Sequence, residues 1–202
     1  MADDRREDIL KDLPEEVKLL LQFEVLKELK RQNPLAMAER KERVGEHSWH
    51  LALSVLLLAE FASEPIDIAR AALLAIVHDT VEAFVGDTFA FGPDVSGQWS
   101  REHQAMKGLK ESFDSKAIHR LVDLWQEYED QETSEARFVK GMDAFLPIVL
   151  NYMNVEHSSW SQHGVHSDQV RKRLGCVRDA IEPLAIINDR MIDQARAEGY
   201  LE

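Results

Sequence analysis

The chain has 202 residues, with 24 Lys and Arg against 37 Asp and Glu, which gives a formal net charge of −13. A composition of 45% hydrophobic and 30% charged residues is typical of a globular protein and excludes a collagen-like or intrinsically disordered chain. The acidic balance argues against a nucleic acid polymer as partner, because binding its phosphates requires a basic surface.

We expect a cytoplasmic protein that does not enter a membrane. The apolar runs Leu51–Ala59 and Ala71–Val77 fall far short of the roughly 18 residues that span a bilayer. Residues 1–8 lack the apolar stretch and the cleavage site of a secretory signal. Cys176 is the one cysteine in the sequence, so we expect neither a disulfide nor a thiolate metal site.

The distribution of apolar residues predicts an all-helical fold. Nine Gly and six Pro in the whole chain, with little alternation of apolar and polar residues, favour helices over strands. No internal repeat or low-complexity linker divides the sequence, so we expect one domain. In chain order, the predicted helices cover about residues 15–30, 46–62, 66–85, 101–112, 116–129, 134–155 and 167–196.

The boundaries of these helices follow from residues that end or begin helices. Asn33-Pro34 ends the first, Ser63-Glu64-Pro65 separates the second from the third, and Gly86 ends the third. Residues 86–97 then form a predicted loop, and loops beside rigid helices often carry function. Thr133 is the expected N-cap of the long helix, which we expect to kink near Pro147.

Three helices carry ionisable side chains on faces that are otherwise apolar. His78 and Asp79 lie near the end of an apolar helical segment, where ionisable groups are costly unless they pair or bind a metal. His47 lies about fifteen residues before the 63–65 turn and His78 about twelve after it, so at about 1.5 Å per residue an antiparallel pair brings them side by side. Asp143 lies on a helix face whose other residues are apolar, where a carboxylate without a nearby cation is energetically costly.

Together, His47, His78, Asp79 and Asp143 predict a metal site. Their mixed nitrogen and oxygen ligands suit Mn, Fe, Co, Ni or Zn better than Ca and leave positions for water and a substrate oxygen. Each residue alone has an ordinary structural explanation, as a core histidine or as a buried hydrogen-bond acceptor. Glu82 favours the metal site, because it lies four residues after His78 on the same helix face.

Four motifs and a fifth segment carry a family resemblance. The segments Glu46-His47-Ser48-Trp49-His50, His78-Asp79-Thr80-Val81-Glu82, Gly86-Asp87-Thr88 and Thr133–Asp143 resemble the motifs of HD-domain metal-dependent phosphohydrolases. Their order, together with Leu124-Trp125-Gln126-Glu127-Tyr128, is similar to the 5′-deoxynucleotidase branch of that family. The resemblance covers about residues 30–180.

This resemblance implies an all-helical HD domain over residues 1–202, with a core at about 30–180 and a terminal helix packed on it from each end. It implies a homodimer in which the four predicted ligands hold one divalent ion, with Mn, Co, Fe, Ni, Zn and Mg as candidates. It makes Glu82 an acid/base or water-orienting residue and Asp87 a contact to the sugar hydroxyl of the substrate. Where that branch has an Arg-Trp pair before Pro34, this sequence has Gln32-Asn33, and Arg31 is one position away.

The function implied by the resemblance is hydrolysis of nucleoside 5′-monophosphates, or a related small phosphate ester, through a metal-bound water. Lys140 and Arg43 each lie about one helical turn before a predicted ligand and are candidates to bind the phosphate, although a surface cation is an equal alternative. We interpret the basic segment Arg171-Lys172-Arg173 as solvated surface.

Other functions stay open. A triphosphohydrolase or a cyclic-nucleotide phosphodiesterase would use the same ligands on another phosphate. A nucleotide- or metal-sensing module without turnover, or a purely structural helical partner, belongs to a different class. Release of phosphate, pyrophosphate or triphosphate from a panel of nucleotides separates the enzymes from one another and from a sensor.

Overall fold

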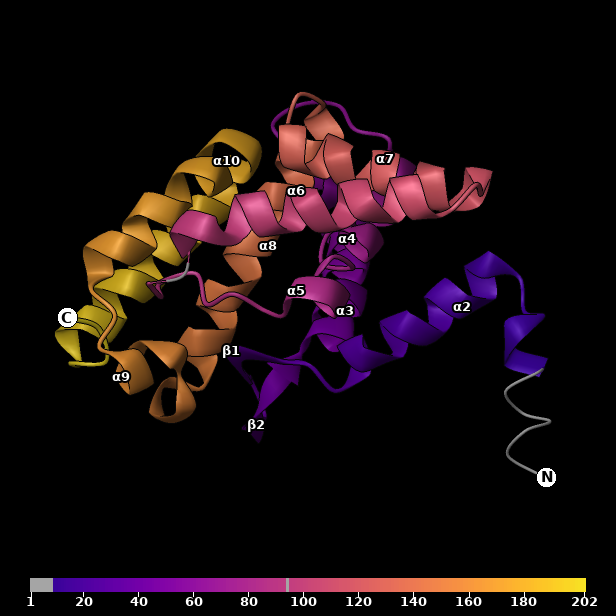
Figure 1. The fold of residues 1–202 in the computed structure, drawn as a ribbon. Helices are drawn as coiled ribbons and strands as arrows, with labels where there is room; N and C mark the ends of the chain where they lie inside the picture. Colours follow the sequence, from indigo (N-terminus) through magenta and orange to yellow (C-terminus); the bar gives the residue numbers. More distant parts are fainter. Residues whose placement is uncertain (1–8, 94) are drawn as a thin grey trace.

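The computed structural model describes residues 9–93 and 95–202, which are mostly helical (Figure 1). The elements are α2 (Glu15–Gln22), η1 (Phe23–Lys27), β1 (Lys30–Leu35), β2 (Ala38–Arg43), α3 (Val44–Leu58), η2 (Ala59–Phe61), α4 (Ile68–Val77), α5 (Glu82–Val85), α6 (Val95–Ser112), α7 (Lys116–Asp130), α8 (Ser134–Met153), η3 (Val155–His157), α9 (Ser159–His163) and α10 (Ser167–Ala197).

Helix α8 lies at the centre of the main hydrophobic core. Its side chains Phe138 and Met142 are almost completely buried, together with Leu174 and Ile181 of α10 and Leu51 of α3. In Figure 1, α10 runs beside α8, while α6 crosses in front of α8 and α7 lies above α6. Because α8 is covered on most sides, the polar side chains it carries are held in fixed positions.

Helices α8 and α10 approach closely at Gly141. A Cβ atom added there would lie 2.8 Å from the Cβ of Ala180 and 3.2 Å from the carbonyl oxygen of Cys176. A few residues further on, α10 bends at Ile181, and Pro183 accounts for the bend because it has no N–H to donate to the preceding turn. The contact between the two helices therefore depends on a residue without a side chain.

A second apolar cluster holds α6 and α7 against the end of α4. Met106 and Leu109 of α6 and Trp125 of α7 pack there with Val77, and Leu19 attaches α2 to the same cluster. This packing places α6 and α7 over one side of the His78 region.

The helical prediction is confirmed, and the bounds of α7, α8 and α10 lie within two residues of the predicted ones. Thr133 caps α8 as expected, since its hydroxyl accepts a hydrogen bond from the N–H of Ala136 at 3.2 Å. Helix α8 continues through Pro147. Over the residues that the structure describes, none of the helices is both long enough and apolar enough for a membrane span.

The hairpin β1–β2 is the main departure from the predicted helices. The helix expected to reach about residue 30 ends at Gln22, and a 3₁₀ turn leads into β1, which pairs antiparallel with β2. Proline is unfavourable in a central strand, but a two-stranded sheet has only edge strands, so β1 tolerates Pro34. The register is irregular between Lys30 and Pro34, so alternation along the sequence did not reveal the strand.

The helix predicted over residues 66–85 is divided. Helix α4 ends at Val77, where the N–H and the hydroxyl of Thr80 both donate to the Val77 carbonyl, at 3.0 and 2.7 Å. The short helix α5 then ends at Gly86, whose φ of 79° suits a residue without Cβ. Because α6 begins at Val95, the predicted loop is shorter than expected.

We expect Gly141→Ala to lower the free energy of unfolding by about 1–3 kcal/mol, because the added methyl group overpacks the contact between α8 and α10. The matched control is Gly175→Ala in α10, where an added Cβ meets nothing within 4 Å. That variant should gain about 0.5–1 kcal/mol from higher helix propensity. Urea unfolding measures both values, and equal effects would contradict the close approach at Gly141.

Candidate metal centre

The two predicted histidine ligands lie side by side. His47 lies in the first turns of α3 and His78 directly follows α4, and the centroids of their rings are 5.3 Å apart. Both imidazoles are almost completely buried. The turn at residues 63–65 reverses the chain between the two helices, as the spacing predicted.

His78 offers a nitrogen that has no hydrogen-bond partner. Its Nδ1 lies 2.9 Å from the carbonyl oxygen of Ala75, which assigns the proton to Nδ1 and leaves a lone pair on Nε2. That Nε2 is buried and accepts no hydrogen bond within the described residues. A buried lone pair without a donor is satisfied by a metal ion, and a backbone carbonyl on the other ring nitrogen is the usual way to orient a ligand histidine.

Asp79 and Asp143 complete the cluster around the two imidazoles. Asp143 Oδ1 lies 3.0 Å from His47 Nε2 and 3.8 Å from His78 Nε2. Asp79 Oδ2 lies 3.1 Å from His78 Nε2 and 3.9 Å from His47 Nε2. Ligand atoms about 2.1 Å from one ion are roughly 3.0–3.4 Å apart in neighbouring positions and up to about 4.2 Å apart in opposite positions. The ligand atoms of His47, His78 and Asp79 all lie within 4.8 Å of one another, which suits a shared divalent ion, and Asp143 Oδ1 lies close to both imidazoles.

Two further side chains orient the cluster from outside. Glu42 of β2 is 1% exposed, and its Oε2 lies 3.4 Å from the Nδ1 of His47. Tyr128 of α7 donates its hydroxyl proton to Asp143 Oδ2 at 3.1 Å. Carboxylate and hydroxyl groups in these positions fix the tautomer of a ligand histidine and the rotamer of a ligand carboxylate.

Arg31 of β1 is the residue at the site that sequence reasoning misplaced. Its guanidinium donates to Asp79 Oδ2 at 2.6 Å, and another of its nitrogens lies 3.9 Å from Asp143 Oδ1. The side chain is 12% exposed. Its position in the sequence was one residue away from the family's pair, and the irregular register of β1 explains why counting residues from Pro34 missed it.

The cluster attracts positive charge. Burial alone would raise the pKa of Asp79, but the neighbouring imidazole of His78 and the charge of Arg31 hold that pKa well below its usual range. Burial and the nearby Arg31 charge act to lower the pKa of His47, yet its hydrogen bond to Asp143 and the nearby carboxylate of Glu42 outweigh both and raise it to about 9. Without a metal, a proton on His47 therefore supplies the cation that the carboxylates require.

Glu82 and Asp87 both line the pocket beside this cluster. Glu82 is 6% exposed, and its Oε2 has no hydrogen-bond partner within the described residues. Burial, with a smaller contribution from the negative charge of Asp79, raises the pKa of Glu82 to about 10. Burial likewise raises the pKa of Asp87. Glu82 is therefore a carboxyl group that holds a proton next to the four predicted ligands.

The pocket beside the cluster has a volume of about 340 Å³ and is lined by residues of α6, α7, α8 and α10. Lys140 of α8 contributes to the wall, with its Nζ 4.7 Å from the ring centroid of Tyr128. Lys172 and Arg173 of α10 also line it. The interpretation of residues 171–173 as solvated surface fits Lys172, which is exposed although it lines the pocket, whereas Arg173 is half-buried. Arg171 is half-buried as well and pairs with Asp189.

Arg43 is not among the residues that line this pocket. Its guanidinium donates to the carbonyl of Lys27 at 2.9 Å and pairs with Glu28 at 2.8 Å, while its N–H donates to Glu46 at the start of α3. The expectation assumed that α3 extends back through residue 43. Because β2 ends there instead, Arg43 does not share a helix face with His47.

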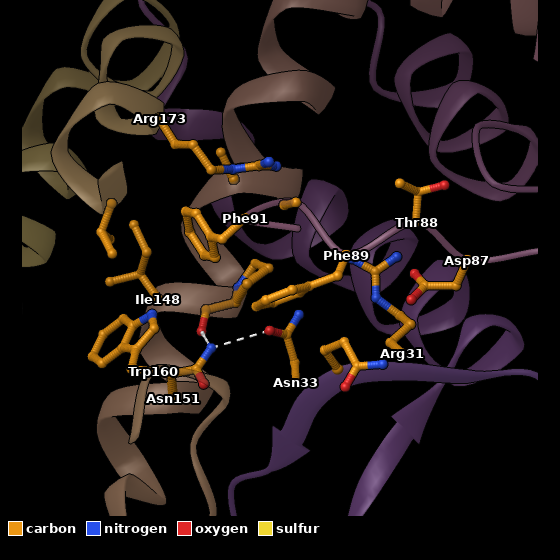
Figure 2. A pocket seen from close by; sticks show the side chains of 15 residues that line it. Arg31, Asn33, Asp87, Thr88, Phe89, Phe91, Ile148, Asn151, Trp160 and Arg173 are labelled. Carbon is orange, nitrogen blue, oxygen red and sulfur yellow. Dashed lines mark hydrogen bonds between the residues drawn. The ribbon is translucent and has the colours of Figure 1, made fainter. Parts of the chain in front are cut away.

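A smaller aromatic pocket adjoins the first and shares Arg31, Asp87 and Arg173 with it. Figure 2 shows Phe89 and Phe91 projecting into this space, with Arg31 rising from β1 on one side and Arg173 reaching over Phe91 from α10. Both phenylalanines belong to the predicted loop over residues 86–97, and aromatic side chains of this kind can stack on a base.

The side chains of Gln32 and Asn33 are both hydrogen-bonded to other residues of the protein. Asn33 accepts a hydrogen bond from the amide of Asn151 at 3.1 Å (Figure 2). Gln32 accepts hydrogen bonds from Lys41 and, at 3.3 Å, from His163 of α9. Both side chains therefore tie β1 to its neighbours while they line the aromatic pocket.

Comparison with known proteins places this geometry in a family. A family model described as HD domain matches residues 23–182. The chain belongs to the HD domain family. The matched range begins before the hairpin and ends within α10, so the HD domain includes all four predicted ligands together with Arg31 and Glu42.

Curated relatives of this HD domain are similar over part of their length. The chain is 31% identical over 122 residues to the human protein named 5′-deoxynucleotidase HDDC2, which is 59% of this chain and 58% of that protein. It is 34% identical over 106 residues to the protein of that name from Bos taurus, 52% of this chain and 50% of the other. The chain thus spans about half the length of the curated relatives that it matches.

One solved structure matches the HD domain over nearly its whole length. It is a crystal structure titled as a predicted metal-dependent phosphohydrolase from Magnetospirillum magnetotacticum MS-1. The sequence identity is 33% and the TM-score is 0.83, with 92% of this chain and 93% of the other covered.

We expect the metal-free protein to bind one Mn²⁺ or Co²⁺ per chain in a calorimetric titration, and His78→Ala and Asp143→Asn each to weaken that binding by about 100-fold or more, because each removes a ligand. His103→Ala is the matched control, since that imidazole stacks on Trp99 of α6. Binding that survives both ligand variants would place the ion elsewhere. At about 100 times its Kd, the ion should stabilise the wild type by about 2.7 kcal/mol.

Proposed function

We propose that the chain is a metal-dependent phosphohydrolase whose substrates are small phosphate monoesters, in particular nucleoside 5′-monophosphates. The observation that carries the proposal is the cluster of His47, His78, Asp79 and Asp143, in which Nε2 of His78 has no hydrogen-bond partner. This cluster opens into a pocket that is also lined by cationic side chains. The names of the curated relatives and of the similar crystal structure support the same reaction class.

A phosphate monoester is a demanding substrate. Its uncatalysed hydrolysis is so slow that enzymes accelerate it by up to about 10²¹-fold, more than positioning alone provides. A divalent ion held by the four ligands would neutralise charge on the phosphoryl oxygens and lower the pKa of a bound water towards about 7. Side chains alone would not supply this combination of charge neutralisation and water activation.

The side chains around the cluster have complementary roles in this proposal. Arg31 and Lys140 place positive charge where the phosphoryl oxygens would lie, since both line the pocket that contains Asp79 and Asp143. Glu82 moves a proton at its free Oε2, between the attacking water and the leaving oxygen. Asp87, at the boundary of the two pockets, accepts a hydrogen bond from a sugar hydroxyl.

The aromatic pocket supports a nucleotide as the substrate. Phe89 and Phe91 lie 5.5 Å apart in an edge-to-face arrangement, and they border the same wall as Arg31 and Asp87. A base placed there would contact aromatic side chains while its phosphate reached the metal cluster. This arrangement favours a nucleoside ester over a small aliphatic phosphate.

The test is a phosphate-release assay with Mn²⁺ or Co²⁺ and a panel of nucleotides. We expect inorganic phosphate from deoxynucleoside and ribonucleoside 5′-monophosphates, and none after chelation of the metal. Release of triphosphate or opening of a cyclic nucleotide would instead identify one of the other phosphohydrolase reactions. Binding without any turnover would identify a sensing module and contradict the proposal.

We expect Glu82→Gln to lower kcat by about 10²–10⁴-fold, because the amide cannot transfer a proton. The matched control is Glu102→Gln, a second buried carboxyl of the same pocket, which accepts a hydrogen bond from Gln98 at 2.8 Å and so already has a partner. The control should keep kcat close to the wild-type value. If both variants lose activity equally, the pocket needs two carboxyl groups for its structure and Glu82 is not the proton carrier.

We also propose that the chain forms a homodimer, as its family resemblance implies. Neighbouring helices α3 and α4 expose large apolar side chains, among them Trp49 at 66%, Leu57 at 70% and Ile76 at 52%. Exposed apolar surface of this kind is typical of an interface. Two copies that each carry a charge of −13 repel, so contact through a face without charges is favoured.

Sedimentation equilibrium tests the dimer. We expect a mass of about twice the 23.1 kDa of the chain for the wild type, and close to the single mass for Leu57→Glu, because a buried carboxylate at the interface would lack a partner. Ile187→Glu on α10 is the control and should remain dimeric, since that side chain is also exposed but lies on another helix. A monomeric wild type would overturn the proposal.

A further inference from the structure

Three cations in the pocket have no acidic partner. Within residues 9–93 and 95–202, no ion pair involves Lys140, Lys172 or Arg173, although the chain has 37 acidic residues and most of its other pocket cations and acids are paired or hydrogen-bonded. Lys140 and Arg173 contact the aromatic rings of Tyr128 and Phe91. Unpaired cations gathered in one pocket of an acidic protein indicate an anionic ligand.

The basic segment of α10 is divided between two sides of the helix. Arg171 pairs with Asp189 at 2.9 Å and also with Asp193, both on the later part of α10. The next two residues line the pocket, and Arg173 belongs to the metal pocket and to the aromatic pocket together. Successive helix residues project about 100° apart, so one run of three cations supplies both a structural ion pair and a ligand-facing pair.

Two of these cations lie apart from those assigned to the phosphate that is hydrolysed. In the proposed function, the divalent ion, Arg31 and Lys140 bind that phosphate. Lys172 and Arg173 come from a different helix, and Arg173 also lines the aromatic pocket with Phe89 and Phe91, where the rest of the substrate would lie. Arginine is well suited to bind a phosphate there, because its guanidinium offers several donors in one plane.

We infer that Lys172 and Arg173 form a second anion subsite, and that the preferred substrates are phosphate esters or anhydrides whose leaving group carries another phosphate. The inference rests on the proposed function. In the reaction, the oxygen of water forms a bond to phosphorus at the metal cluster, the P–O bond to the leaving group breaks, and the leaving oxygen takes a proton. The second phosphate stays on the product and serves only for recognition.

Two kinds of nucleotide present such a phosphate. A nucleoside 3′,5′-bisphosphate carries it on the sugar, and a nucleoside 5′-diphosphate carries it directly next to the reacting phosphate, to which an anhydride bond joins it. The common chemistry is a negatively charged phosphate on the leaving group, and the two compounds place it at different distances from the metal cluster. Measuring both therefore identifies which spacing the subsite fits.

The experiment measures dissociation constants by calorimetry with the full chain. The probes are 2′-deoxyadenosine 5′-monophosphate, the 3′,5′-bisphosphate and the 5′-diphosphate. We expect at least one of the two doubly phosphorylated probes to bind about tenfold or more tightly than the monophosphate. The double variant Lys172→Gln/Arg173→Gln should bind that probe and the monophosphate with nearly equal affinity.

The matched control is Arg171→Gln/Arg178→Gln, which removes the same charge from the same helix, at two residues that both pair with Asp189. It should keep the preference for the second phosphate. Glutamine is a good helix former, and the unfolding temperature of each variant checks that α10 is intact.

The possible results separate this inference from the proposed function. Equal affinity of the wild type for all three probes overturns the inference, and so does a preference that survives in Lys172→Gln/Arg173→Gln or disappears in the control. Phosphate release is recorded separately under the same conditions. Absence of turnover with every probe overturns the proposed function, while the binding preference still decides whether the subsite exists.

Discussion

The interior of this protein holds two carboxylates that require positive charge. Asp79 and Asp143 lie within 4 Å of two buried imidazoles, and Arg31 reaches the same place from β1. A buried carboxylate without a cation is costly, so the surrounding elements are arranged to supply one. The helices that form the core are also the helices that carry the charged groups, so the stability of the fold and the affinity of the site for a cation depend on each other.

The short hairpin β1–β2 places two charged side chains beside the cluster. The hairpin β1–β2 provides Arg31 and Glu42, one of which contacts a carboxylate and the other an imidazole. Helices position a side chain within a turn of its neighbours, whereas the hairpin brings in groups that no helix of the bundle can place on that side. The hairpin therefore serves the site more than it serves the core, to which it adds few buried apolar side chains.

The sequence predicts the helices and the meeting of His47 with His78 because helix geometry converts spacing directly into distance. It also identifies Asp143, since a carboxylate on an apolar face requires an explanation. It does not place Arg31, because an irregular strand register changes which side chain faces inwards. It does not show that Lys172 and Arg173 line the pocket, because a run of like charges does not reveal which of its members face a neighbouring helix.

The absence of a side chain at Gly141 has an effect beyond packing. Gly141 is next to Lys140 and two residues before Asp143, and the α10 residue whose carbonyl it would touch, Cys176, lines the metal pocket together with Arg173. The separation of α8 and α10 therefore sets the width of the space between the cluster and the basic helix. Because residue 141 has a hydrogen atom where other residues have a Cβ, the two helices can approach closely. Their separation in turn fixes the distance that a bound molecule has to bridge between them.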